Sequence, residues 1–254
     1  MLKRAWGLTR SMVMYHGQPA KYRRMVRFYG QFLGPGDLGF DIGAHVGSRV
    51  RAWRKLGARV LAIEPQPDCL AVLRLMFGRS ASVTILPVAV GAEPGHAQLA
   101  VSTATPTVST LSTEWISSVS GDPGFSRVRW DKSVPVSVVT LDELIGTYGV
   151  PAFCKIDVEG FEVEVLRGLS TPLRALSFEY LPPAHDAALA ALDLVARLGT
   201  YEYNYVAVET ARFASSSWLT ASELIAVLDQ RRPLGRSGDV YARLTRAADP
   251  HAAA

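Results

Sequence analysis

The chain has 254 residues, 48% of them hydrophobic and 20% charged, and 27 Lys and Arg against 23 Asp and Glu give a formal net charge of +4. This length fits one large domain or two small ones, and the composition excludes a disordered chain, a collagen-like repeat and a disulfide-rich scaffold. No apolar run approaches the roughly 20 residues of a membrane-spanning helix. Two cysteines, Cys69 and Cys154, are too few for a secreted framework, so we expect a cytoplasmic protein with both cysteines in its core.

The positive charge is concentrated in residues 1–36, which hold seven basic residues and no acidic one. The remaining 20 basic residues meet 23 acidic ones, so the rest of the chain carries a charge of −3. This pattern favours one or two amphipathic helices that form a basic cap on the domain. Contact with a membrane surface or an acidic substrate is an alternative, and an organellar presequence is a third.

Strand-like and helix-like stretches alternate along the rest of the chain. We expect strands at residues 38–42, 59–63, 83–90, 134–139, 153–157, 176–179, 203–208 and 239–244. Helices are expected at residues 46–56, 67–77, 161–167 and 184–198, and after the capping residues Thr140 and Thr220. Strands joined by helices at this spacing are typical of βαβ units, and therefore of a doubly wound, mostly parallel α/β sheet.

The expected domain covers residues 37–246 and has a sheet of seven strands. The last two strands lack a parallel crossover of the usual length, so we expect an antiparallel strand at the edge. Residues 95–132 break the alternation and are rich in Ser, Thr, Gly and Pro, which is typical of a functional or mobile loop. Residues 247–254 are expected to form a disordered tail.

The loop after the first strand has the pattern D-x-G-x-x-x-G, with Asp41, Gly43 and Gly47 at its fixed positions. Gly43 lets the backbone turn sharply near a ligand, and Gly47 lets the following helix begin close to the strand. The dinucleotide pattern G-x-G-x-x-G fails, because its later glycines would fall on His45 and Ser48. An acid before the first glycine suits a cationic amino-acid ligand better than a pyrophosphate.

Glu64 ends the second strand, 23 residues after Asp41. An acid at about this separation accepts hydrogen bonds from ribose hydroxyls in nucleotide sites. Together, the two acids predict a site for S-adenosylmethionine. The structural alternatives are that Asp41 caps the following helix and that Glu64 is a solvated strand end. An NAD(P)-type oxidoreductase is the functional alternative, against which the glycine spacing counts.

Four motifs then occur in order, at residues 41–47, 64–65, 140–144 and 155–162. They resemble the FkbM family of class I S-adenosylmethionine-dependent methyltransferases, and the resemblance covers residues 34–180. The segment I-D-V-E-G-F-E and the V-L-R-G that follows it are specific for the family, whereas His45 stands where the family more often has asparagine. The expected cofactor-binding residues are Asp41, Gly43, Ala44, His45, Gly47, Glu64, Pro65, Ala89 and Asp157.

Acids at the ends of later strands are the candidates for catalysis. Methyl transfer needs an acceptor oxygen held in line and a group that removes its proton. We expect Asp157 and Glu179 to be catalytic, and Glu159, Ser109 and His185 to bind the acceptor. The alternatives are that Glu159 only favours the first turn of a helix and that His185 lies on a solvated helix start. For Glu179 the alternative is binding of a metal or a sugar hydroxyl. Carboxylates at three strand ends leave metal binding open, although no spaced set of His, Cys and Asp makes it specific.

The resemblance implies O-methylation of a hydroxyl on a sugar, a glycolipid or a secondary metabolite, and residues 103–133 are a candidate lid over this acceptor. A disordered surface loop is the alternative for that segment. A nucleic-acid substrate is not expected: the D/N-P-P-Y/F motif of amino-group methyltransferases is replaced by Asp157-Val158-Glu159-Gly160, and neither cysteine follows a proline. A cofactor-binding module without catalysis stays open, as does the oligomeric state.

Overall fold

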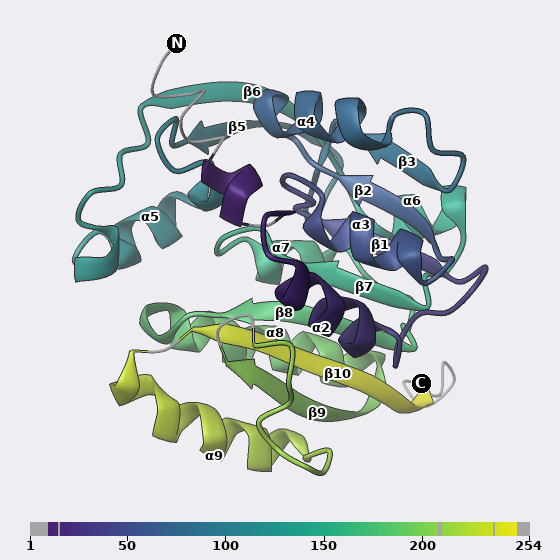
Figure 1. Cartoon of the computed structure of the whole chain (residues 1–254). Helices are drawn as coiled ribbons and strands as arrows, with labels where there is room; N and C mark the ends of the chain where they lie inside the picture. Colours follow the sequence, from purple (N-terminus) through teal and green to yellow (C-terminus); the bar gives the residue numbers. More distant parts are fainter. Residues whose placement is uncertain (1–9, 15, 208–209, 236, 248–254) are drawn as a thin grey trace.

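The structure is a computed structural model that describes residues 10–14, 16–207, 210–235 and 237–247. A central sheet runs through it with the strand order β3-β2-β1-β7-β8-β10-β9 (Figure 1). Its strands are β1 (Leu38–Ile42), β2 (Arg59–Ile63), β3 (Val83–Leu86), β7 (Phe153–Ile156), β8 (Ala175–Tyr180), β9 (Gly199–Ala207) and β10 (Gly238–Ala247). The predicted seven-stranded, doubly wound sheet is therefore confirmed.

The antiparallel strand lies one position inside the edge that we predicted for it. The pairs from β3 to β8 are parallel, whereas β10 is antiparallel to both β8 and β9. The chain reaches β9 first, at the edge, and β10 then returns between β9 and β8. An antiparallel return needs no crossover over the sheet, so the final strand can fill the space beside β8.

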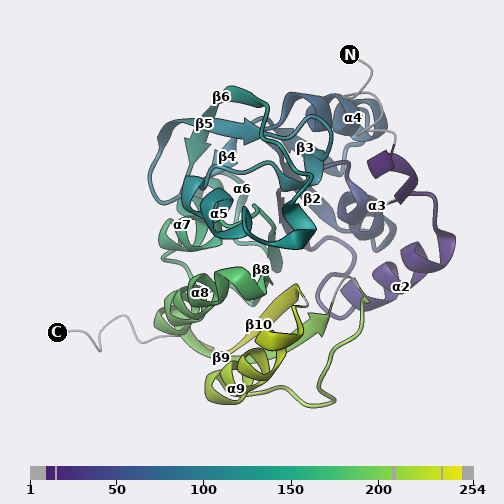
Figure 2. The same ribbon diagram turned by 90° about the vertical axis from the view of Figure 1, so that its left-hand side faces the viewer.

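Helices cover both faces of the sheet (Figure 2). One face packs against α2 (Pro19–Tyr29), α3 (Ser48–Lys55) and α4 (Pro67–Phe77), and the other against α6 (Leu141–Tyr148), α7 (Glu162–Arg167), α8 (His185–Leu198) and α9 (Ala221–Arg231). Alternate residues of a strand face opposite sides. On β1, Phe40 and Ile42 therefore enter the core under α6 to α9, whereas Asp41 faces the side of α2 and α3.

A second, three-stranded sheet lies beside the central one and corrects two predictions. It has the order β4-β6-β5, with β4 (Ala89–Val90), β5 (Gly95–Val101) and β6 (Lys132–Val139). The strand predicted at residues 83–90 is divided between β3 and β4, and the strand predicted at 134–139 is part of β6. The region 95–132 is not irregular throughout, because it contains β5 and α5 (Thr113–Val119).

The predicted helix starts agree closely with the structure. Thr140 and Glu143 form a reciprocal capping box at α6, and Thr220 and Glu223 form one at α9. α2 lies within the cap expected at residues 1–36, of which 1–9 and 15 are outside the described residues. Of the expected tail, residue 247 ends β10 and 248–254 are outside the described residues, as is residue 208 of the strand predicted at 203–208.

Aromatic packing fixes α2 and the residues that directly follow it on the sheet. Phe32 stacks on Phe153 of β7 at 4.7 Å between ring centroids and on Tyr241 of β10 at 5.7 Å, and Tyr29 lies edge-on to Trp53 of α3. The helix is thus part of the same core as α3. None of the helices described here is long and apolar enough to cross a bilayer.

Candidate active site

A cavity of about 310 Å³ opens at the carboxyl ends of β1, β2, β7 and β8. This is the edge at which doubly wound sheets bind ligands. Its walls come from the loops after β1, β2 and β7, from the ends of β8 and β10, from the start of α3, from β4 and from the connection between β5 and β6. Among the described residues, five carboxylates and one arginine line it, which are Glu64, Asp157, Glu159, Glu179, Asp239 and Arg49. The cavity is therefore strongly acidic.

The loop after β1 turns at Gly43, whose φ of +78° lies in the left-handed region. A Cβ atom at this position would stand 1.9 Å from the carbonyl oxygen of Asp157, so only glycine lets the loops after β1 and β7 approach so closely. Gly47 also has a φ of +78°, and its Cβ would stand 2.4 Å from the ring of Phe77 on α4. Its close approach is therefore to α4 rather than to the strand.

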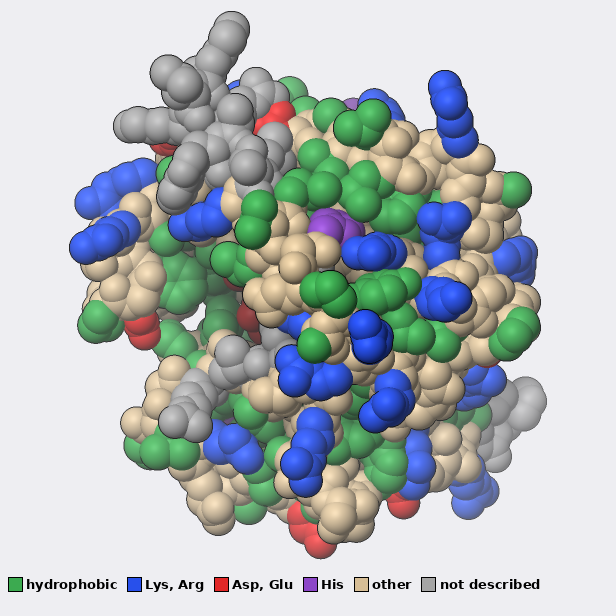
Figure 3. All heavy atoms as spheres, viewed as in Figure 1, with side chains coloured by type: hydrophobic (Ala, Val, Ile, Leu, Met, Phe, Trp, Pro, Cys, Tyr) green, Lys and Arg blue, Asp and Glu red, His purple; other side chains and the backbone are tan. Residues whose placement is uncertain are grey.

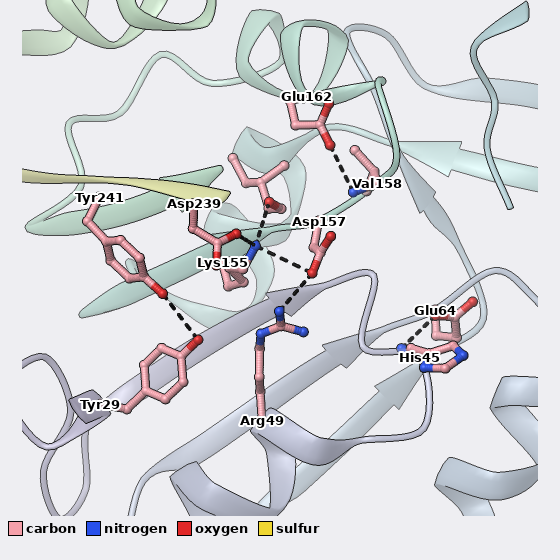
Figure 4. Close-up of polar contacts among 11 residues, drawn as sticks. Tyr29, His45, Arg49, Glu64, Lys155, Asp157, Val158, Glu162, Asp239 and Tyr241 are labelled. Carbon is pink, nitrogen blue, oxygen red and sulfur yellow. Dashed lines mark hydrogen bonds and ion pairs between the residues drawn. The ribbon is translucent and has the colours of Figure 1, made fainter. Parts of the chain in front are cut away.

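Glu64 holds the loops after β1 and β2 together. One carboxylate oxygen accepts a hydrogen bond from the backbone N–H of His45 (Figure 4). The other accepts one from the backbone N–H of Gln66, and each bond measures 2.8 Å. The side chain is 6% exposed, and burial raises the pKa of Glu64 to about 7 although both hydrogen bonds lower it. Each oxygen keeps a lone pair for a ligand hydroxyl.

Asp157 lies between two cations at the end of β7 (Figure 4). Its Oδ2 is 2.9 Å from Arg49 of α3 and 3.4 Å from the fully buried Nζ of Lys155, which also binds Asp239 at 2.8 Å. Burial alone would raise the pKa of Asp157, but the charges of Lys155 and Arg49 outweigh it and hold the pKa below its ordinary value. Asp157 is thus a fixed anion.

Glu159 and Glu179 extend this acidic group. One carboxylate oxygen of each lies within 4.8 Å of one from Asp157. Burial and the charge of Asp157 raise the pKa of Glu159 well above its ordinary value, and burial with the charge of Glu159 does the same for Glu179. Both carboxyl groups therefore bind a proton more readily than an ordinary glutamate does. Three carboxylates at this spacing can also ligate one divalent cation, which the sequence pattern did not predict.

The connection between β5 and β6 forms the opposite wall. Ser109 lines the cavity, and its Oγ donates a hydrogen bond to the carbonyl oxygen of Pro106. Thr110 Oγ1 donates to the carbonyl oxygen of Glu159 at 2.6 Å, where the backbone has a φ of +53°. Trp115 is 3% exposed and packs edge-on against Trp130. Residues 106, 107 and 109–111 of this segment line the cavity, and its role as a lid stays a prediction.

Most of the predicted site residues line the cavity, and four do not. Those that line it are Gly43, His45, Glu64, Pro65, Ala89, Ser109, Asp157, Glu159 and Glu179. Ala44 is buried and donates its N–H to Ile63 of β2. Asp41 is fully buried on β1, beside Lys155 on β7. Gly47 is used to pack α3 on α4, as described above.

His185 is the fourth, and its expected role in acceptor binding is wrong. The side chain is 4% exposed, and its Nε2 lies 3.0 Å from Asp229 of α9, while Tyr180 lies on its other side. It therefore joins α8 to α9 rather than facing the cavity. Glu179, although close in sequence, faces the opposite side of β8 from Tyr180, because strand residues alternate.

Burial raises the pKa of Asp41 to about 6, and the charge of Arg49 only partly opposes this effect. Within the described part of the chain, neither carboxylate oxygen has a hydrogen-bond partner. Its contribution to the site is therefore a charge behind Arg49 and Lys155, not a contact with the cavity.

Four functional residues were missed by sequence reasoning: Arg49, Gln66, Lys155 and Asp239. The position of Arg49 indicated a nearby anion, because a basic residue in the first turn of a helix is unfavourable for the helix dipole. Lys155 gave a similar indication, because a charge between Cys154 and Ile156 of a buried strand needs a partner. Gln66 and Asp239 gave none beyond their places near strand ends.

These residues fit a cofactor that joins a nucleoside to a cationic amino acid. Glu64 offers carboxylate oxygens to ribose hydroxyls. Gln66 is 3% exposed and lines the cavity, and its Nε2 has no hydrogen-bond partner among the described residues, so it can donate to a ligand. Asp157 and its neighbours supply the negative charge that favours sulfonium and ammonium groups.

Comparisons with known proteins find methyltransferases. The model of the family "Methyltransferase FkbM domain" matches residues 41–216. A curated relative, the hexuronic acid methyltransferase AglP of Haloferax volcanii, is 27% identical over 154 residues, which are 56% of this chain and 54% of that protein. The chain thus spans about half the length of this relative.

Solved structures of similar arrangement include methyltransferases. Precorrin-6y C5,15-methyltransferase from Geobacter metallireducens has 14% identity and a TM-score of 0.47, over 87% of this chain and 86% of that chain. The O-methyltransferase of Bacillus cereus in complex with SAH has 10% identity and a TM-score of 0.46, over 90% and 82%. The family model covers more than half of the chain and includes Asp41, Glu64 and Asp157, so this chain belongs to the FkbM methyltransferase domain family.

Proposed function

We propose that the chain transfers a methyl group from S-adenosylmethionine to a hydroxyl oxygen of a sugar, a glycolipid or a secondary metabolite. Methyl transfer itself follows from family membership, and S-adenosylmethionine agrees with the residues of the cavity. The observation that carries the choice of oxygen is the pair Glu159 and Glu179, whose raised pKa values suit proton removal from a hydroxyl. An NAD(P)-type oxidoreductase is not supported.

The mechanism assigns each acid a separate task. The cofactor supplies a methyl group on a sulfonium sulfur. With the cofactor bound, Glu179 in its ionised form would accept the hydroxyl proton of the acceptor and so make the acceptor oxygen a better nucleophile toward the methyl group. Glu159 orients the acceptor by a second hydrogen bond. Asp157, kept ionised by Lys155 and Arg49, provides a fixed negative charge that does not take up the proton.

The acceptor class is proposed on two grounds. Carboxylates and the hydroxyl group of Ser109 line the cavity, and both pair well with sugar hydroxyls. The curated relative is named a hexuronic acid methyltransferase. A hexuronic acid or a glycolipid that contains one is therefore the first acceptor to test.

The test is transfer of labelled methyl from S-adenosylmethionine into a panel of hexuronic acids, neutral sugars, glycolipids and polyketides, with and without a chelator. We expect at least one hydroxylated acceptor to yield a methyl ether by NMR. A methyl ester, or methylation only at carbon or nitrogen, would contradict the proposed O-methylation at a hydroxyl. Tight cofactor binding with no transfer to any acceptor would indicate a binding module instead.

Glu64 makes cofactor affinity depend on pH. Its pKa of about 7 in the free protein should fall when ribose hydroxyls donate to the carboxylate, so binding favours the ionised form. We expect affinity to rise by up to about tenfold between pH 6 and pH 8, with release of close to one proton at the lower pH. Calorimetry in two buffers of different ionisation enthalpy measures both quantities.

The matched comparison is Glu64→Gln against Glu93→Gln, which changes an exposed acid. Glu64→Gln should bind more weakly and lose the proton release, while Glu93→Gln should behave as the parent chain does. Binding that is unchanged in Glu64→Gln, or equal proton release in both variants, would remove Glu64 from the cofactor site.

A further inference from the structure

Two packed helices, α2 and α3, form a face of strong positive charge. Together they hold eight basic residues and no acidic one, and Arg51 of α3 lies over the ring of Tyr22 of α2 at 4.2 Å. Arg49 turns inward to the active site, whereas Arg23 and Arg27 are exposed. Lys and Arg side chains are widespread over these helices in Figure 3, with Asp and Glu mainly at the margins. We refer to α2, α3 and residues 10–14 as the basic face.

Apolar side chains lie next to this charge. Residues 10–14 are helical, and within them Val13 is 66% exposed and Met14 is 42% exposed. His16 follows this segment closely and connects it to the loop after β1. Its Nε2 lies within hydrogen-bond distance, 2.9 Å, of the carbonyl oxygen of Val46. Exposed apolar residues beside basic ones are typical of helices that rest in the boundary of a bilayer.

We propose that the basic face docks the protein on an anionic lipid bilayer, with Val13 and Met14 entering the layer between headgroups and acyl chains. Each basic residue near an anionic surface adds to the attraction, and the two apolar side chains add hydrophobic burial. Nucleic acid would also attract the positive charge, but it offers nothing for exposed Val13 and Met14. The bilayer explains both features.

Docking in this way would also position the active site. The hollow that contains acidic side chains is visible in Figure 3 on the same side of the molecule as the basic face. The active-site cavity and the basic face share α3, which supplies Ser48 and Arg49 to the cavity. A surface-bound enzyme would therefore hold its cavity near the headgroup region. The docking proposal itself stands whether or not the acceptor is a lipid.

The test is sedimentation of the chain with vesicles of phosphatidylcholine alone or mixed with phosphatidylglycerol. Arg23→Gln/Arg27→Gln removes two charges from the basic face. Its matched control is Arg167→Gln/Arg197→Gln, which removes two charges from exposed positions on α7 and α8, across the sheet. Val13→Asp tests the apolar contact. A thermal unfolding midpoint for each variant verifies that it is folded.

We expect binding to the mixed vesicles only, weakened by added salt. Arg23→Gln/Arg27→Gln should weaken it by about 30-fold, and Val13→Asp by about tenfold, while the control binds as the parent chain does. Equal binding to phosphatidylcholine, or an equal loss in the control, would overturn the proposal. So would tighter binding to a short duplex DNA that Val13→Asp leaves unchanged. Cofactor binding should be the same in all variants, which separates this result from the proposed activity.

Discussion

Replacing Glu179 by glutamine is expected to lower the rate constant of methyl transfer by about 10²- to 10⁴-fold, which is the usual contribution of a general base. Glutamine keeps the shape of the side chain but cannot accept the acceptor proton. Cofactor affinity should change little, because Glu64 and the loop after β1 are intact. The measurements are kcat, KM and the affinity for S-adenosylhomocysteine, with Glu93→Gln as the matched control at an exposed position.

The pH profile separates proton removal from positioning. Glu179 must be ionised to act as a base, and its pKa is raised by burial and by Glu159. Activity should therefore increase with pH through the pKa of this carboxyl, and Glu179→Gln should lose that rising limb. If Glu179→Gln raises KM but leaves kcat and the limb unchanged, Glu179 binds the acceptor and does not act as the base.

Replacing Lys155 by methionine should reduce the free energy of unfolding by about 3–5 kcal/mol, the range observed when one member of a buried ion pair is removed. Lys155 is fully buried, and its Nζ lies 2.8 Å from Asp239 and 3.4 Å from Asp157. Methionine has a similar length, so the loss comes from two carboxylates without their shared cation. Urea denaturation measures the change, and Lys132→Met, at an exposed position, should stay within about 0.5 kcal/mol.

This loss should depend on pH in a definite direction. Lys155 and Arg49 hold the pKa of Asp157 below its ordinary value of 3.8, so their contribution to stability is present above that pH and is lost as the pH falls through the folded-state pKa. The difference between the parent chain and Lys155→Met should therefore shrink in acid. In addition, Lys155→Met/Asp239→Asn should be less destabilised than the sum of the single variants. Full additivity would mean that the two side chains do not interact.

The cofactor end of the site was largely predictable from the sequence. Gly43 and Glu64 could be placed because each follows a strand that reads clearly as buried, and the carboxyl ends of parallel strands meet at one edge. Asp157 followed for the same reason. Asp41 was placed on the correct strand, but which face of the strand it occupies depends on the alternation of side chains, and this kept it out of the cavity.

The rest depended on contacts between distant parts of the chain. Lys155 meets Asp239, 84 residues later, and no local pattern predicts such a pair. β5 was missed because its sequence, GHAQLAV, has few residues that favour strands, so its pairing with β6 decides the conformation. α5 is short and rich in serine, and burial of Trp115 stabilises it. The sequence predicted an accessible His185, because the helix that covers it, α9, lies far along the chain.

The small sheet has a consequence for how this family member could change its acceptor. β4, β5 and β6 hold a small hydrophobic cluster made of Ala89, Leu99, Val101 and Val136, while Val90 of β4 belongs to a cluster of the central sheet. The connection between β5 and β6 is held on one side by the small cluster and on the other by Thr110, which donates to the carbonyl oxygen of Glu159. Ser109 and Pro106 line the cavity and bond to one another within the connection, so we expect substitutions at these two positions to alter one wall of the cavity while Glu64 keeps its contacts. Selection for a new acceptor can thus proceed in this connection while the methyl-donor half stays unchanged.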